Sequence, residues 1–177
     1  MRSRLTKWIV LTAGLFVPVA VMLFLKIFGK NEFEVKPFYQ DTLPVRPSYC
    51  PDNAKVPYTL PASMLARLNS TGSSSLVLCW FSKPDIVVLQ RIRNLFSEEE
   101  LAMVAAVADL QNDDLLKTSL HIPSDSISFY NSCYLFLPEQ KSAVLVDKTG
   151  RIRGYYHTTR DEIDRLLMEV SIILKKY

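Results

Sequence analysis

The periodicity of apolar and polar positions changes several times between residue 75 and the end of the chain, and these changes predict an α/β domain. Residues 75–81 form a run that is apolar on both faces, which is typical of a buried strand. A stripe at helical spacing follows, made by Ile86, Leu89, Ile92 and Phe96. We expect Ser82 to be the N-cap of this helix and Pro84 to lie in its first turn.

The segment from Ser97 to Asp109 carries two conflicting signals. Ser97 and Glu100 have the spacing of a helical capping box, and the high alanine content also favours a helix. The alternation of strands and helices around the segment instead requires a strand here. On that ground we predict a strand over residues 101–108.

Shorter elements complete the predicted domain. We expect short helices at residues 61–68 and 113–119, and strands at residues 133–137 and 143–146. The sequence Asp147-Lys-Thr-Gly150 is typical of a hairpin turn, from which a further strand returns through residues 151–156.

The last helix is the clearest element in the sequence. Thr159 and Glu162 have the spacing of a capping box, and Arg165 falls on the face that we expect to meet water. The predicted buried face consists of Ile163, Leu166, Leu167, Val170 and Leu174. Strand, helix, strand, helix, hairpin and final helix is the order of a thioredoxin-like α/β domain, with a central mixed sheet flanked by helices.

The first thirty residues have the pattern of a membrane anchor. Residues 8–25 are eighteen residues without a charge, preceded by Arg2, Arg4 and Lys7 and followed by Lys26 and Lys30. At about 1.5 Å per residue this helix would span roughly 27 Å, close to the thickness of a bilayer core. A cleaved signal peptide would have a shorter apolar core and small residues at a cleavage site. We therefore predict an uncleaved transmembrane helix, with the basic N-terminus in the cytoplasm.

Three segments follow from these patterns. Residues 1–30 are expected to form a cytoplasmic tail and transmembrane anchor, and residues 74–177 the thioredoxin-like domain. Residues 31–73 are rich in proline and in large aromatic side chains, which flexible linkers rarely carry. We expect this middle segment to be extended and to pack partly on the domain.

The net charge depends on whether the anchor is counted. The whole chain of 177 residues has a formal net charge of +3, but residues 1–30 hold five basic residues and no acidic one. Residues 31–177 therefore hold 16 basic against 18 acidic residues, a net charge of −2. Because no basic patch with interleaved aromatic residues remains, the sequence argues against nucleic acid as a partner.

Cysteine and histidine spacing excludes the usual zinc sites. The chain has three cysteines, Cys50, Cys79 and Cys133, in no C-x-x-C pair, and two histidines, His121 and His157. Cys79 lies in the apolar strand and is expected to be a buried thiol. Cys50 and Cys133 are the pair to consider for a disulfide, which would fix the extended segment to the domain.

Several stretches of the chain together resemble the Sco/SenC proteins, particularly those of Bacteroidetes. These stretches are the anchor, the sequence FGKNEFEV, the strand entering residues 83–87, and VLVDKTGRIRGYY before the last helix. The family consists of membrane-anchored thioredoxin-fold proteins that help to load copper into cytochrome oxidase. The resemblance spans most of the chain, and its most specific part is residues 144–156.

The resemblance also implies that the copper ligands of the family are missing here. The family has two cysteines four positions apart, with proline after the first. Lys83 and Val87 occupy the matching positions, and Pro84 keeps the proline. The third ligand of the family is a histidine shortly before the LVD strand, where Glu139 lies near the matching position. Two thiolates and an imidazole suit copper, whereas a lysine, a valine and a glutamate do not.

We therefore expect a non-catalytic protein of the cell envelope, with no cofactor and no catalytic residue. The chain would be held in the cytoplasmic membrane by a single span, with its C-terminal domain in the periplasm. It would bind a protein partner, such as a respiratory complex during oxidase assembly. The alternative is an active copper chaperone or thiol-disulfide oxidoreductase with rearranged ligands. No Ser/His/Asp or paired-carboxylate pattern supports another enzyme class.

Overall fold

The computed structural model describes residues 8, 14–24, 26, 34–51, 54–68, 74–106 and 122–176. The chain forms two compact units, residues 1–34 and residues 35–177. In the first unit, residues 14–24 are helical. None of the helices in the described ranges is both long enough and apolar enough for a membrane crossing. The predicted span of residues 8–25 lies partly outside those ranges, because residues 9–13 and 25 are not among them.

The second unit is built on a four-stranded mixed sheet, which confirms the α/β class. Its strands are β1 (Leu76–Trp80), β2 (Leu101–Ala105), β3 (Ala143–Asp147) and β4 (Ile152–Tyr156), in the order β2-β1-β3-β4. β1 pairs with β2 in parallel and with β3 antiparallel, and β3 pairs antiparallel with β4. All four strands were predicted from the sequence, although β2 is shorter than expected.

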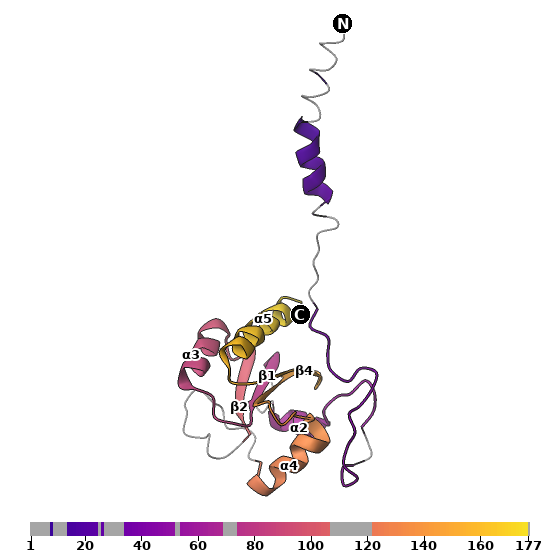
Figure 1. Cartoon of the computed structure of the whole chain (residues 1–177), viewed down its shortest axis with the longest axis vertical. Helices are drawn as coiled ribbons and strands as arrows, with labels where there is room; N and C mark the ends of the chain where they lie inside the picture. The colour runs from indigo at the N-terminus through magenta and orange to yellow at the C-terminus, as the bar shows by residue number, and fades with distance from the viewer. Residues whose placement is uncertain are drawn as a thin grey trace. The chain divides into compact units, whose positions relative to one another are not determined.

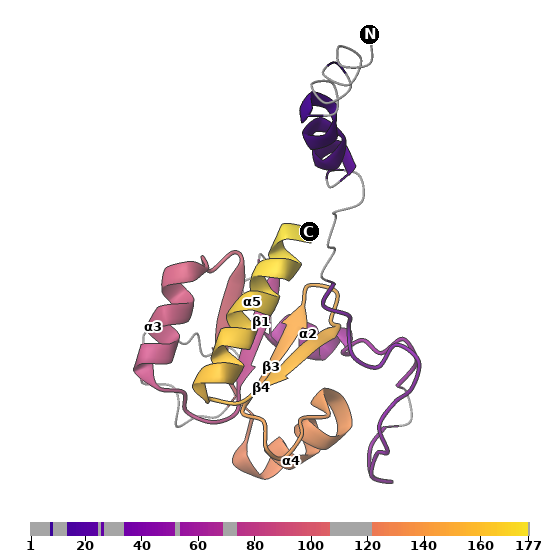
Figure 2. The ribbon, with the colours of Figure 1, turned by 45° about the horizontal axis from the view of Figure 1, so that its top comes forward.

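Helices cover both faces of the sheet (Figures 1 and 2). On one face, α3 (Ile86–Leu95) and α5 (Arg160–Lys176) enclose a core that includes Trp80, Leu89 and Leu166. On the other face, α2 (Ala62–Leu68) and the helical run of α4 (Ile127–Tyr130) enclose a second core that includes Tyr58 and Tyr155. The helices predicted at residues 61–68 and after residue 159 are thus confirmed, whereas the one predicted at 113–119 lies outside the described residues.

The strand predicted over residues 133–137 is wrong. A 3₁₀ turn, η2 (Ser124–Ser126), leads into α4 and then into a π-helix, η3 (Asn131–Leu135), which ends at Phe136 with a positive φ of 51°. Backbone groups that would hydrogen-bond to a neighbouring strand have other partners here. The Leu135 carbonyl accepts a hydrogen bond from the Tyr155 hydroxyl at 2.6 Å, and the Leu137 N–H donates to the Asn131 carbonyl.

The conflict in the segment after Ser97 is resolved by burial. The Glu100 carboxylate accepts from the Ser97 N–H at 2.9 Å, and the Ser97 hydroxyl accepts from the Glu100 N–H, so the capping box forms. It caps a single turn only. Leu101 to Ala105 then pair with β1 along its full length, and all five are buried. Burial on both faces of the sheet outweighs the helix propensity of the alanines.

The start of α3 also differs from the prediction. Asp85, not Ser82, is the N-cap, since its backbone is extended and its carboxylate accepts from the Val87 N–H at 3.1 Å. Pro84 is buried and precedes the helix instead of lying in its first turn. The extended conformation of Asp85 places the capping oxygen where the first free N–H groups of the helix need it.

Residues 35–51 and 54–61 pack on the domain, in the same compact unit. The Phe38 N–H donates to the Ile152 carbonyl and the Leu60 N–H to the Gly150 carbonyl, each at 2.8 Å. The predicted hairpin turn is confirmed, because the Gly150 N–H donates to the Asp147 carbonyl at 2.9 Å. Gly150 has a φ of +81°, and a Cβ there would press on the Leu60 backbone, so both conformation and packing require glycine.

Candidate functional site

The segments that follow β1 and β4 and the segment that precedes β3 meet at one end of the sheet. Trp80, the last residue of β1, pairs with Ala105 of β2 and with Ala143, and Ala143 pairs with Tyr156. β1, β2 and β4 thus end at the edge where β3 begins. The Phe81 N–H donates to the Ser142 carbonyl, and the Ser142 N–H donates to the Tyr156 carbonyl, each at 2.8 Å. The motif positions predicted from the sequence lie at this end of the sheet, which holds the carboxyl ends of β1, β2 and β4.

Three of the four motif positions lie in two of these segments, and the fourth, Val87, follows in α3. Lys83 is exposed and Pro84 is buried in the loop between β1 and α3, and Val87 is 63% exposed in the first turn of α3. Glu139 is exposed in the turn that precedes β3. The register brings both segments to the same end of the sheet. In the part of the chain that the structure describes, the side chains of Lys83 and Glu139 form neither an ion pair nor a hydrogen bond with protein groups.

The ligand chemistry at this end of the sheet is sparse. Lys83 and Val87 offer no ligand atom for a soft metal, and Glu139 offers one carboxylate. Over the described ranges, no three His, Cys, Asp or Glu side chains gather in a way that could hold a metal ion. Cys79 is fully buried in β1, and burial raises the pKa of its thiol well above the ordinary value. A thiolate is therefore disfavoured at this position.

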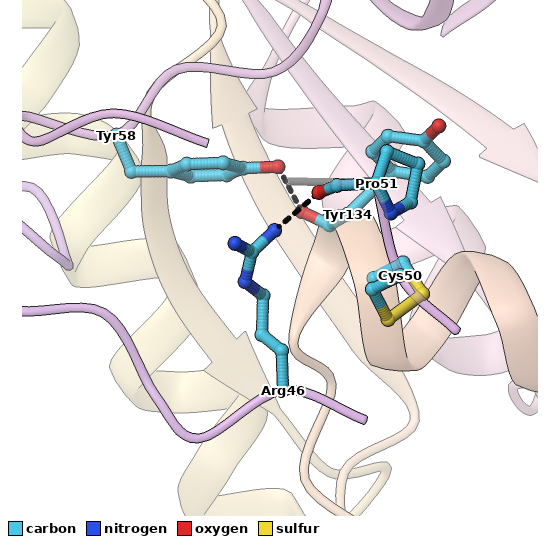
Figure 3. Close-up of a disulfide and its surroundings, with 6 residues drawn as sticks. Arg46, Cys50, Pro51, Tyr58 and Tyr134 are labelled. Carbon is cyan, nitrogen blue, oxygen red and sulfur yellow. Dashed lines mark hydrogen bonds between the residues drawn. A yellow bond between two sulfur atoms is a disulfide. The ribbon is translucent and has the colours of Figure 1, made fainter. Parts of the chain in front are cut away.

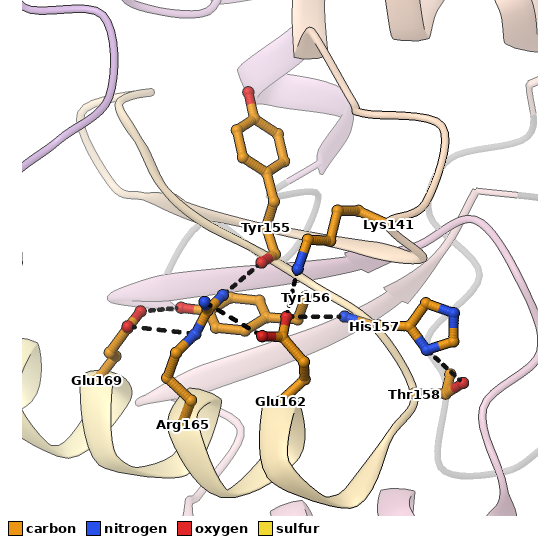
Figure 4. Close-up of polar contacts among 8 residues, drawn as sticks. All are labelled: Lys141, Tyr155, Tyr156, His157, Thr158, Glu162, Arg165 and Glu169. Carbon is orange, nitrogen blue, oxygen red and sulfur yellow. Dashed lines mark hydrogen bonds and ion pairs between the residues drawn. The ribbon is translucent and has the colours of Figure 1, made fainter.

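A chain of charged groups holds the Glu139 turn against α5 (Figure 4). The Lys141 ammonium lies 2.6 Å from the Glu162 carboxylate, which also accepts from the His157 N–H at 3.4 Å. Mainly because of the Lys141 hydrogen bond, the pKa of Glu162 lies below its ordinary value. Glu162 therefore stays charged at neutral pH and ties the 138–142 segment to the first turn of α5. The sequence predicted a capping box between Thr159 and Glu162. In the structure the Glu162 carboxylate instead accepts from the His157 N–H.

Arg165 lies on the exposed face of α5, as predicted, and it also continues this chain of charges. Its guanidinium donates to the Tyr155 carbonyl at 2.6 Å and pairs with Glu162 at 3.2 Å and with Glu169 at 3.5 Å. It also lies 5.0 Å from the centre of the Tyr156 ring, a cation–π distance. The spacing of Glu162, Arg165 and Glu169 at three and four residues was a sequence signal for this network.

The Tyr156 side chain completes the network from the sheet. Its hydroxyl donates to the Glu169 carboxylate at 2.5 Å, and burial, together with that carboxylate, raises the pKa of the phenol far above its ordinary value. Its ring lies over Gly154, where a Cβ would overlap it. Because the phenol stays protonated and hydrogen-bonded to Glu169, it links β4 to α5.

Cys50 and Cys133, the pair considered from the sequence, are joined by a disulfide in the structure (Figure 3). Their Cα atoms lie 5.2 Å apart, and Cys133 is buried in η3. The Tyr58 hydroxyl donates to the Tyr134 carbonyl at 2.7 Å beside the bridge. The disulfide thus fastens the proline-rich segment to the helical run that replaced the predicted strand.

A buried ion pair behind the β3–β4 turn was not foreseen. Asp147 and Arg153, 8% and 3% exposed, approach to 2.8 Å, and the Arg153 guanidinium also donates to the Val35 carbonyl at 2.9 Å. Arg153 is buried and Arg151 is exposed, whereas Tyr155 and Tyr156 are both buried, one in each core.

Comparisons of this chain with protein-family models, with curated proteins and with solved structures found no match.

Proposed function

We propose that this chain is a membrane-anchored, Sco-like protein that lacks the copper and redox site and works by binding a protein partner. Its anchor is the apolar stretch of residues 8–25, its location the cytoplasmic membrane with the domain in the periplasm, and its role the assembly of a respiratory oxidase. The domain is thioredoxin-like in this proposal.

One observation carries the proposal. The loop that follows β1 and the turn that precedes β3 meet at the carboxyl end of a β2-β1-β3-β4 sheet, as the strand registers require. Lys83 and Glu139, which match ligand positions in the resemblance, lie in these two segments, and Val87, which matches the third, lies in the first turn of α3 directly after the loop. The order of elements around the sheet supports a thioredoxin-like domain, and the residue types support the loss of its metal and thiol chemistry.

A binding role is supported by the apolar side chains at the start of α3. Ile86 and Val87 are 45% and 63% exposed, next to the exposed cation of Lys83. Exposed apolar groups beside a charge are typical of contact surfaces rather than of catalytic centres. The network of Lys141, Glu162 and Arg165 keeps the neighbouring turn in place, which lowers the ordering cost of binding.

The alternative, an active copper chaperone or thiol oxidoreductase, needs accessible sulfur. Cys79 and Cys133 are 0% and 2% exposed, and Cys133 is bonded to Cys50. Catalytic thiols are exposed and have a lowered pKa, whereas the pKa of Cys79 is raised by burial. The observations therefore favour the binding role.

Site-specific photo-crosslinking in native membranes tests this function. A photoreactive amino acid replaces Val87, and a matched variant carries it at Met168 on α5, which is 64% exposed. The proposal predicts that the full chain stays with the membrane fraction and that Val87 captures an envelope protein that Met168 does not. Recovery of the chain in the soluble fraction, or equal capture at both positions, would contradict it.

A further inference from the structure

A hollow lies at the opposite end of the sheet from the motif positions. It has a volume of about 440 Å³ and is bounded by the start of β1, the β3–β4 turn, β4 and the last turns of α5. Small-molecule sites in proteins typically occupy about 300–1,000 Å³. The hollow lies wholly within the compact unit of residues 35–177.

Two cations without partners line this hollow. Lys148 and Arg151 both line it and are both exposed. Throughout the described ranges, neither side chain takes part in an ion pair or hydrogen bond with another protein group. Both are thus available to an anion, and an arginine with a lysine is a common pair for phosphate oxygens.

The turn that carries these cations is held rigidly. One oxygen of the Asp147 carboxylate accepts from the Thr149 N–H at 2.9 Å and from the Arg151 N–H at 3.0 Å. The Lys148 N–H donates to the Ser75 carbonyl of the neighbouring segment at 3.1 Å. Because the backbone of the turn is fixed on both sides, an anion bound there does not have to order it.

The remaining charges leave the hollow positive. Arg153 and Asp147 neutralise each other, and Glu100, whose carboxylate accepts from Ser97, offsets one of the two free cations. The net charge of the lining is therefore one positive charge, which attracts an anion. The wall at the α5 side is apolar, with Ile173 buried and Leu174 half-buried.

We propose that this hollow binds a phosphate ester whose phosphate meets Lys148 and Arg151 and whose organic part lies on Ile173 and Leu174. An anionic phospholipid headgroup and a soluble phosphate ester share this chemistry. The lipid source rests on the membrane anchor proposed above, whereas the soluble source does not.

The test is titration of the purified full chain in neutral maltoside micelles, followed by amide NMR shifts of residues 148–151. The probes are dihexanoyl phosphatidylglycerol below its micelle concentration, glycerol 3-phosphate, and hexanoate as a carboxylate of similar apolar length. Lys148→Gln with Arg151→Gln removes the two cations. Lys83→Gln with Arg160→Gln makes the same charge change on exposed residues that do not line the hollow.

The proposal predicts saturable shifts with a phosphate ester, at least tenfold weaker binding in the Lys148/Arg151 variant, and unchanged binding in the control. Tighter binding of the phospholipid assigns a headgroup, and equal binding of glycerol phosphate assigns a soluble ester. If the membrane proposal is wrong, the soluble ester can still bind to the hollow. A failure of the proposed function can therefore be distinguished from a failure of the phosphate site. No saturable shift with either ester, equal binding of hexanoate, or an equal loss in the control would overturn the proposal.

Discussion

Removing the carboxylate of the buried pair, by Asp147→Ala, should destabilise the domain severely. Arg153 is 3% exposed, so its guanidinium would remain buried after its ion pair with the Asp147 carboxylate is lost, while it keeps its hydrogen bond to the Val35 carbonyl. Breaking a buried ion pair in this way typically costs about 3–5 kcal/mol. Since a domain is stable by about 5–15 kcal/mol in all, a large part of the stability would be lost.

The assay is thermal and urea unfolding of the oxidised full chain, followed by circular dichroism. For a domain of this size the loss corresponds to a decrease in Tm of roughly 10–20 °C. Asp147→Ala combined with Arg153→Leu should recover part of it, because the buried guanidinium is then removed together with its carboxylate. Lys148→Ala, in the same turn but exposed, is the control and should change the stability by less than about 0.5 kcal/mol.

The pH dependence gives a second readout. Burial raises the pKa of the Asp147 carboxyl, but hydrogen bonds from Thr149 and Arg151 and the pair with Arg153 outweigh it, so the pKa lies below its ordinary value. A depressed pKa in the folded state contributes stability above the unfolded pKa, about 3.9, which is lost as the pH falls through the folded pKa. The difference between wild type and Asp147→Ala should therefore shrink below pH 4. Equal unfolding of Asp147→Ala and Lys148→Ala, or a difference independent of pH, would refute the reasoning.

Two further predictions concern packing and the disulfide. Leu166→Ala with Val170→Ala removes two fully buried side chains of α5, and at about 2–5 kcal/mol for the leucine alone it should lower the Tm sharply. Met168→Ala, on the exposed side of the same helix, should barely change the Tm, and equal effects would show that α5 is not packed on the sheet. Cys50→Ser with Cys133→Ser should cost about 2–5 kcal/mol, measured by urea unfolding, and an unchanged midpoint would contradict the bridge.

The elements with strong periodicity could be predicted from the sequence, and the others could not. The stripe of α5 and the apolar run of β1 are long and regular, and both were placed correctly. The segment of residues 133–137 has the composition of a strand, but its carbonyls are taken by tyrosine hydroxyls from residues 58 and 155. Those partners are distant in sequence, so no local pattern could reveal the π-helix.

The polar networks were the least predictable part of the site. The spacing of Glu162, Arg165 and Glu169 predicts mutual contact on α5, but not that Tyr156 lies beneath Arg165. The burial of Arg153 depends on Asp147, six residues earlier across a hairpin, and on a carbonyl more than a hundred residues away. Alternation along a strand predicts on which face of the sheet a side chain lies. How deeply that side chain is buried depends on the segments that pack over that face.

Copper affinity tests the central claim most directly, since the claim is that this fold keeps the position of a metal site without its ligands. The full chain, with its disulfide intact, competes with a chromophoric chelator for Cu(I), beside a variant with Lys83→Cys, Val87→Cys and Glu139→His. We expect no stoichiometric binding by the wild type and a gain of at least about a hundredfold in the variant, because two thiolates and an imidazole suit copper. One copper ion bound per wild-type chain at nanomolar affinity, lost in Cys79→Ser, would contradict the account, as would a folded variant that gains nothing.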